Sequence, residues 1–335
     1  SSYVSCSPGR PAGDIKGFWT YQLDCQEWTF NRDSDERGWI DVDIDPVAKA
    51  VANKYCPIIN TLKKSGQGYG IWDKKADPLY SKGRKAYTNE DYEKALKFFD
   101  KALAANPNYV DIYWYRGLTK SALNDYKGAV NDYTKMTELN PNEKDSYAYR
   151  GEAKIVLNDY KGAIKDYDKY IEIDPKDALA YYNRGYAKSE LGDYKGAIKD
   201  YTKAIEIDPK NIDFHYRRGY AKSELGDYKG AIKDYTKAIE IDPKNAWAYK
   251  SRGYAKRELG DYKGAIKDYT KAIEIDPNDA HTLYTLGRAK YKLGNTEDGC
   301  IDIRKAVSIG DESFLESVKE HLSSKEGKKE RAWCK

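Results

Sequence analysis

The sequence has few residues of the kinds that hold metals or form covalent intermediates. Its 335 residues include three histidines, five cysteines and one methionine, Met136. His215, His281 and His321 lack the spacing to a second histidine or to a cysteine that a zinc site needs. No grouping of serine or cysteine with histidine indicates nucleophilic catalysis. We therefore expect no enzymatic activity, no metal site and no cofactor.

Two stretches imitate ligand-binding loops without their essential residues. The glycines of SGQGYG, at 66, 68 and 70, lack the Lys and Ser or Thr of a phosphate-binding loop, which favours a flexible linker. Asp41, Asp43 and Asp45 open like a calcium loop, but Pro46 stands where that loop needs glycine and Ala52 where it needs glutamate. These aspartates fit better on the edge of a strand, with Asp45 as the cap of a helix that follows it.

Long apolar runs are also missing. No run approaches the length of about 18 apolar residues that a membrane-spanning helix requires, so we expect no membrane span. The sequence begins at Ser1 without methionine, which is expected either after removal of a signal peptide or after trimming. We expect a secreted or cell-surface protein, with the cytoplasm as the alternative.

Charge is abundant but balanced. The net charge of +4 arises from 58 basic and 54 acidic residues that are closely interspersed, as in KGAIKDYTKAIEID. Interspersed charges are typical of a solvated helix surface, whereas a nucleic-acid footprint gathers basic residues on one face. We therefore expect no nucleic-acid partner.

A unit of 34 residues repeats along most of the chain. The stretch from Asp193 to Asn211 returns unchanged from Asp227 to Asn245, and again from Asp261 as far as Pro277. One glycine recurs in every unit, at positions 83, 117, 151, 185, 219, 253 and 287. A fixed period of this length indicates stacked helix pairs, and the register predicts seven units over residues 76–313.

Each unit contains the signals of two helices joined by a tight turn. Gly192 suits the left-handed residue that follows a helix, and Asp193 suits the cap of the next helix. Apolar residues then recur three and four apart until Pro209 ends the helix. Gly185 and Ala197 are small, which predicts that two helices approach closely at these residues.

These markers closely resemble the tetratricopeptide repeat family. The resemblance rests on the glycine of the first helix and on the alanines, the aromatic residue and the closing proline of the second, for example Ala197, Tyr201, Ala204 and Pro209. It implies an all-α fold, a right-handed superhelical α-solenoid of antiparallel helix pairs with a concave groove. It also implies a protein-binding function, without naming the partner.

In that family the first helix of each pair lines the groove. The corresponding positions carry aromatic residues here, and such rows can hold extended peptides. The groove candidates are Trp114, Tyr182, Tyr186, Tyr216, Tyr220, Trp247 and Tyr254. The alternative is that these side chains only pack between adjacent helices. The lysines and asparagines with which some family members clamp a peptide carboxylate are missing at these places.

The regions outside the repeats predict two end caps. Residues 1–75 contain four of the seven tryptophans and no repeat, and we interpret them as an arm and a small cap of mixed α+β or irregular structure. Within this cap, the run GFWTYQLDCQEWTF predicts one or two short strands. Residues 314–335 predict a capping helix, with Phe314, Leu315, Val318 and Leu322 on one side, and a tail.

The cysteines suggest two kinds of bond. A bridge between Cys25 and Cys56 would close a loop of about 30 residues and stabilise the cap, although free buried thiols are the alternative. Cys300 occupies a position where the preceding five repeats carry Ile or Val, which predicts burial. Cys6 and Cys334 lie on the terminal arms, where an intermolecular bridge, with Trp333 docking beside it, is a hypothesis.

Two functions follow from these observations. The first is a non-enzymatic scaffold whose groove holds another protein or peptide. The alternative is an extracellular structural protein that assembles with further copies of itself, cap to last repeat, into oligomers or a filament.

Overall fold

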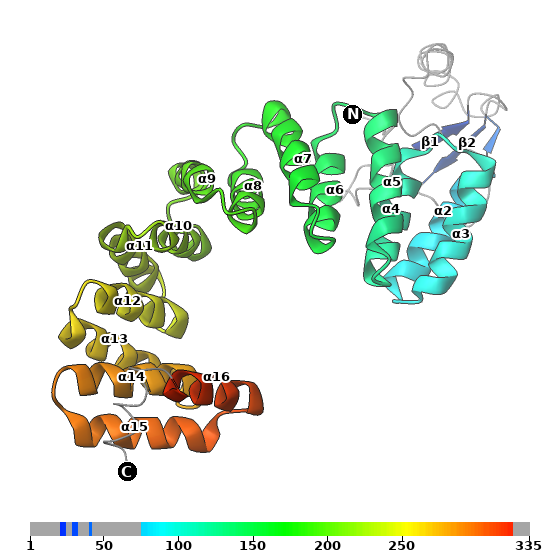
Figure 1. Cartoon of the computed structure of the whole chain (residues 1–335). Helices are drawn as coiled ribbons and strands as arrows, with labels where there is room; N and C mark the ends of the chain where they lie inside the picture. The colour runs from blue at the N-terminus through cyan, green and yellow to red at the C-terminus, as the bar shows by residue number, and fades with distance from the viewer. Residues whose placement is uncertain (1–20, 25–28, 33–39, 42–74, 324–335) are drawn as a thin grey trace. The chain divides into compact units, whose positions relative to one another are not determined.

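The computed structural model describes residues 21–24, 29–32, 40–41 and 75–323. The chain divides into two compact units, residues 1–158 and residues 159–335, and each is described by itself. We call them unit 1 and unit 2 (Figure 1).

The described part of the N-terminal region is a small antiparallel sheet in unit 1. Its strands are β1 (Tyr21–Asp24), β2 (Thr29–Arg32) and β3 (Ile40–Asp41), in the order β1-β2-β3. In the first ladder Tyr21 pairs with Arg32, and in the second Thr29 pairs with Asp41. The prediction of short strands in this stretch is confirmed.

The rest of unit 1 is helical. Its helices are α2 (Ala76–Thr88), α3 (Tyr92–Ala105), α4 (Val110–Ala122), α5 (Tyr126–Leu139) and α6 (Lys144–Val156). Each packs against the next along the chain. The core of unit 1 is rich in aromatic residues, and Phe99 and Ile112 are fully buried within it.

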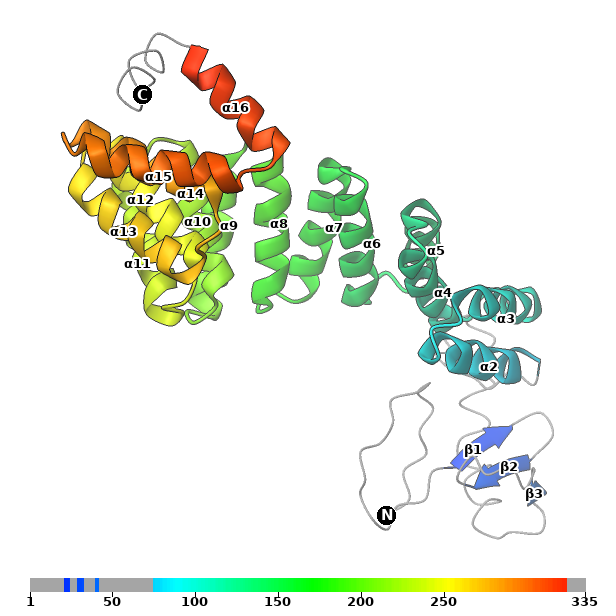
Figure 2. The same cartoon turned by 90° about the horizontal axis from the view of Figure 1, so that it is seen from below.

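Unit 2 continues the same alternation (Figure 2). First helices of the repeats are α8 (Ala178–Glu190), α10 (Ile212–Glu224), α12 (Ala246–Glu258) and α14 (Ala280–Lys292). Second helices are α7 (Tyr160–Ile173), α9 (Tyr194–Ile207), α11 (Tyr228–Ile241), α13 (Tyr262–Ile275) and α15 (Thr296–Ile309). The predicted all-α array of helix pairs is confirmed.

The turn within each repeat has the predicted chemistry. Gly192 adopts a φ of +78°, a conformation that glycine reaches without steric cost. The Asp193 side chain then accepts a hydrogen bond of 2.9 Å from the backbone N–H of Gly196, which caps α9. The same pair recurs as Gly226 with Asp227 and as Gly260 with Asp261, so the repeats that begin with α8, α10 and α12 reverse direction in the same way.

A glycine lets the two helices of a repeat touch. A Cβ added to Gly185 of α8 would lie 2.9 Å from Cε1 of Tyr201 on α9, closer than ordinary packing allows. Tyr201 is 1% exposed, and Ala197 beside it is fully buried. The predicted close approach is therefore confirmed, with a buried tyrosine ring as the group that fills the space over the glycine.

The C-terminal end of the array is covered by a helix, as predicted. Helix α16 (Glu312–Ser323) follows α15, and its Phe314 and Val318 are 3% and 4% exposed. The Phe314 ring meets Tyr284 of α14 edge-on, with 6.0 Å between ring centroids. Cys300 of α15 is buried, again as its position in the repeat predicts.

Several predicted features lie outside the described residues. They are the bridge between Cys25 and Cys56, the intermolecular contacts of Cys6, Cys334 and Trp333, the glycine-rich stretch at residues 65–70, and the helix cap that follows the strand of Asp41. These features, the self-assembly that depends on them, and the domain boundaries remain predictions.

Candidate functional site: the first helices of unit 2

The first helices of unit 2 form one continuous side of the array. Helix α10 contacts both α8 and α12 directly, although a second helix separates them in the sequence. Among the described residues, the second helices α9, α11 and α13 have no comparable contact with one another. The first helices α8, α10 and α12 therefore lie closer together than the second helices do, on the inner side of unit 2. We call the exposed side chains of α8, α10, α12 and α14 the first-helix face.

Two of the candidate tyrosines fill space between helices. Tyr182 lies 5.2 Å from Phe214 of the next first helix and 5.9 Å from Tyr201, measured between ring centroids. Tyr216 lies 5.6 Å from Tyr235, and its hydroxyl is 3.3 Å from Oγ of Ser251. Both rings are half-buried. They join neighbouring repeats through these contacts.

Tyr186 is partly packed against a neighbouring helix and partly exposed to solvent. It is half-buried, and the guanidinium of Arg217 from α10 lies over its ring at 5.1 Å. Burial lowers the pKa of Arg217, but nearby Tyr182 raises it and outweighs the burial. The two tyrosines and the arginine thus link α8 to α10 on the first-helix face.

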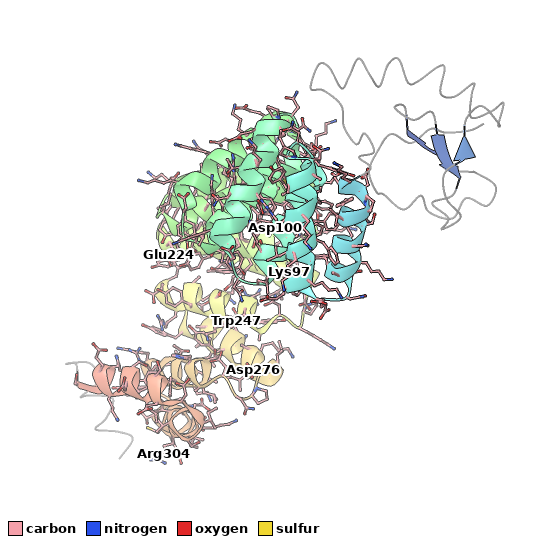
Figure 3. The ribbon with its side chains drawn as sticks, turned by 90° about the vertical axis from the view of Figure 1, so that its right-hand side faces the viewer. Lys97, Asp100, Glu224, Trp247, Asp276 and Arg304 are labelled. Carbon is pink, nitrogen blue, oxygen red and sulfur yellow. The ribbon has the colours of Figure 1, made fainter. Side chains whose placement is uncertain are left out.

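The other three candidates of unit 2 project into solvent. Trp247, Tyr254 and Tyr220 are 65%, 41% and 39% exposed, and they are the most exposed aromatic side chains among the described residues. All three come from first helices, and Figure 3 marks Trp247. Leu179 of α8 adds an apolar side chain that is 57% exposed.

Trp247 is held in place by a neighbouring cation. Nζ of Lys250 lies 5.0 Å from the ring centroid of Trp247 and 2.9 Å from a carboxylate oxygen of Asp279. Burial raises the pKa of Asp279, but the hydrogen bonds from Lys250 and Thr282 outweigh it and lower that pKa. Asp279 stays ionised and fixes Lys250 below the indole, which presents a flat apolar surface outward.

Trp114 belongs to unit 1 and has a different environment. Its ring lies 4.8 Å from Tyr115 and 5.9 Å from Tyr149, and it packs against the core of that unit. Trp114 is half-buried. In unit 1 this side chain therefore takes part in aromatic packing.

Sequence reasoning missed a set of charges inside the array. Arg218 of α10 donates from Nε and Nη2 to the two carboxylate oxygens of Asp234, at 3.0 and 2.6 Å, and Lys222 adds an ion pair of 2.7 Å. The Asp234 side chain is only 5% exposed. Equivalent sets surround Asp132, Asp200 and Asp268.

This finding corrects part of the prediction that the charges form a solvated surface. The signal was present, because an arginine precedes the marker glycine and an aspartate precedes the buried tyrosine in repeat after repeat. Charges at fixed positions of a repeat can pair in the interior as well as face solvent.

The first-helix face offers several kinds of group for recognition. Its groups are aromatic rings, hydroxyls and carboxylates at helical intervals. Where the structure describes the chain, no three His, Cys, Asp or Glu side chains gather as metal ligands. None of the helices in the described ranges is long and apolar enough to cross a bilayer.

Comparison with known proteins identifies the repeat. Models described as tetratricopeptide repeat match residues 76–109, 110–143, 178–211, 212–245 and 234–267. A further model, described as TPR repeat, matches residues 151–192 and 253–294. No curated protein matches the sequence.

Solved structures share the fold at low identity. The C-terminal part of a TPR repeat-containing protein from Cytophaga hutchinsonii is 20% identical, with a TM-score of 0.61 over 69% of this chain and 99% of that chain. A tetratricopeptide repeat protein from Parabacteroides merdae is 20% identical, with a TM-score of 0.56 over 75% and 98%. YrrB, described as a TPR protein with an unusual peptide-binding site, is 22% identical, with a TM-score of 0.50 over 56% and 96%.

Proposed function

This chain belongs to the tetratricopeptide repeat family, and we propose that the first-helix face of its unit 2 binds an extended segment of another protein. As a member of this family the chain is a protein-interaction scaffold. The proposal adds which part of the chain carries the interaction and what kind of segment it holds.

One observation carries the proposal. Trp247, Tyr254 and Tyr220 are the most exposed aromatic side chains of the described residues, and all three come from first helices of consecutive repeats. Aromatic side chains supply large contact areas at low entropic cost and are enriched among residues that dominate binding energy. Their repetition along unit 2 suits a ligand that extends across several repeats.

The likeness to YrrB agrees with this proposal. That protein is described as having a peptide-binding site, and the present chain shares its fold. We further propose that the chain has no catalytic activity of its own. We propose secretion or display at the cell surface, with the cytoplasm as the alternative, and separation of cell fractions would decide between them.

A peptide selection tests the proposed function. The full chain is immobilised, extended peptides are selected from a displayed random library, and the selected peptides are titrated against variants. We expect the double variant Tyr220→Ala, Trp247→Ala to weaken binding about tenfold or more, because the removed side chains hold the ligand.

Leu259→Ala provides the matched control. Leu259 is 45% exposed but follows the end of α12, at the turn. Its replacement should leave the affinity unchanged. If circular dichroism shows that the double variant is folded and the selected peptides bind it as tightly as the unaltered chain, the first-helix face is not the binding surface.

A further inference from the structure

Three consecutive repeats of unit 2 build the same small cluster at the end of the first helix. Each cluster, which we call a rung, contains a tyrosine and a glutamate one turn apart on a first helix, and a tyrosine from the preceding second helix. The rungs are Tyr160, Tyr186 and Glu190; Tyr194, Tyr220 and Glu224; and Tyr228, Tyr254 and Glu258.

The third rung already holds a cation of the chain itself. The guanidinium of Arg257 lies over the Tyr254 ring at 4.8 Å and donates from Nη2 to Oε1 of Glu258 at 2.7 Å. Tyr228 closes the side of this rung, with its ring 6.4 Å from that of Tyr254 and nearly perpendicular to it. The combination of ring face and carboxylate therefore accommodates a guanidinium group.

The second rung has the same groups without the internal cation. The residue equivalent to Arg257, 34 positions earlier, is Ser223. Tyr220 is 39% exposed, and Glu224 forms no ion pair with any residue in the described ranges. Tyr194 lies close to this carboxylate, because burial and then the charge of Glu224 raise the pKa of Tyr194. Figure 3 marks Glu224 on α10.

The first rung is partly occupied. Arg217 covers one side of the Tyr186 ring but forms no ion pair with the carboxylate of Glu190 in the part of the chain that the structure describes. Serine again stands at the position of Arg257, as Ser189. Glu190 therefore adds a second negative charge beside the second rung, without a cation of its own among the described residues.

The helix ends add to this attraction. Glu190, Glu224 and Glu258 are the last residues of α8, α10 and α12. The carbonyl groups at a helix C-terminus carry partial negative charge, which favours a cation placed there. Beyond the third rung the charge at these positions becomes positive, because Arg288 and Lys292 replace the tyrosine and the glutamate on α14.

We propose that the second rung binds an arginine side chain of the extended partner segment, with the carboxylate of Glu190 receiving a further basic residue. Neighbouring first helices pack about 10 Å apart, and an extended chain rises about 3.3 Å per residue, so the two basic residues stand three positions apart. The partner chemistry is a segment of the form Arg-x-x-Arg. This inference rests on the proposed function and narrows it to one class of ligand.

The repeat itself supplies the test variants. Ser223→Arg places in the second rung the side chain that Arg257 places in the third, so this arginine should occupy the site in place of the ligand's arginine. Arg257→Ser should remove the internal cation from the third rung and let a ligand arginine bind there. Glu224→Gln removes the carboxylate charge at the exposed end of α10. Ser308→Arg adds the same charge on an exposed position of α15 and controls for the added charge, whereas Ser223 itself is 9% exposed.

The probe is a fluorescein-labelled peptide of twelve residues with arginine at every third position, titrated into the full chain and followed by fluorescence anisotropy. A second peptide carries citrulline, which is neutral and nearly isosteric, in place of arginine. We expect the arginine peptide to bind about tenfold tighter than the citrulline peptide, and Ser223→Arg and Glu224→Gln each to weaken it by about tenfold. Arg257→Ser should tighten binding, and Ser308→Arg should not change it.

Three results overturn the inference: equal affinity for the two peptides, no binding of the arginine peptide, or an equal loss with Ser223→Arg and Ser308→Arg. If Ser223→Arg does not fold, Glu224→Gln and Arg257→Ser decide the matter. Failure here is distinct from failure of the proposed function. Library peptides whose binding depends on Tyr220 and Trp247 but shows no preference for arginine would support the proposed function and contradict the arginine-binding proposal.

Discussion

A single residue at the turn of each repeat adopts a left-handed backbone conformation. Asparagine occupies this position in two repeats, where Asn124 and Asn158 have φ values of 62° and 59°. Glycine occupies it later, and Gly226 has a φ of +76° with open space where a Cβ would point. The conformation is therefore required by the turn and not by crowding.

This geometry predicts an order of stability at one position. Gly226→Ala should lower the free energy of unfolding by about 1 kcal/mol, because a Cβ strains the left-handed conformation. Gly226→Asn should cost clearly less, because asparagine tolerates that conformation and already stands in the same register. Urea unfolding followed by circular dichroism measures both, and an equal cost for the two would contradict the strain argument.

One half-buried carboxyl should make unit 1 sensitive to pH. Burial, opposed by Arg84 and reinforced by Glu143 and Asp77, raises the pKa of Asp111 from 3.8 to about 6. Between these values the folded state binds more protons than the unfolded state, so the free energy of unfolding falls as pH rises through this window.

Asp111→Asn should remove this dependence. We expect the variant to be more stable than the unaltered chain by about 1 to 2 kcal/mol at pH 7.5 and equally stable near pH 3, below both pKa values, because asparagine is neutral at both. Thermal unfolding of the two proteins at both pH values provides the measurement. A difference that is the same at both pH values would exclude titration of Asp111 as the cause.

At the scale of helices, an arginine joins three elements of unit 2. Arg218 of α10 binds Asp234 of α11 in its own repeat, and its Nη1 donates to Oγ1 of Thr202 on α9 at 3.2 Å. Arg252 repeats this arrangement with Asp268 and with Thr236, at 3.0 Å. The network fixes the spacing between one repeat and the next.

Removing one member of the network should cost more than removing a surface pair. Asp234→Asn leaves Arg218 and Lys222 without their buried counter-charge, and we expect a loss of about 3 kcal/mol in the free energy of unfolding. The control is Glu240→Gln, which breaks an ion pair with Lys237 whose side chains are 51% and 58% exposed, and it should cost less than about 0.5 kcal/mol. Chemical denaturation distinguishes the two, and similar losses would contradict the buried network.

The sequence predicted the helices well and their buried faces less completely. The period, the capping aspartates and the closing prolines are local signals, so the helix pairs and the turn at Gly192 followed from them. The packing of Tyr182 depends on Phe214 of the next repeat, which no local signal reveals. The recurrence of Arg218 and Asp234 was visible in the sequence but their pairing was not, because their separation of 16 residues becomes a contact only after the helices pack.

At the scale of the whole array, the near-identity of the repeats predicts that one can be removed. Deleting residues 212–245 joins Asn211 to Ala246, which natively follows Asn245, so the linking sequence is kept. Arg252 would then meet Thr202 in place of Thr236. Because repeats contact only their neighbours, the remaining chain should fold with unchanged helicity per residue and a lower free energy of unfolding.

Far-ultraviolet circular dichroism and urea unfolding test this deletion. Loss of helicity or of the cooperative transition would show that these residues contribute more than one interchangeable repeat. The deleted chain also lacks the second rung, so it should bind the arginine peptide as weakly as Glu224→Gln.

The location of a bound peptide is the most direct test of the account. A selected library peptide carrying a photo-reactive group would be cross-linked to the full chain, and the attachment points mapped by mass spectrometry. We predict attachment to α8, α10 and α12, near Tyr220 and Trp247. Attachment concentrated on the second helices α9, α11 and α13 would contradict the claim that the first-helix face is the binding surface.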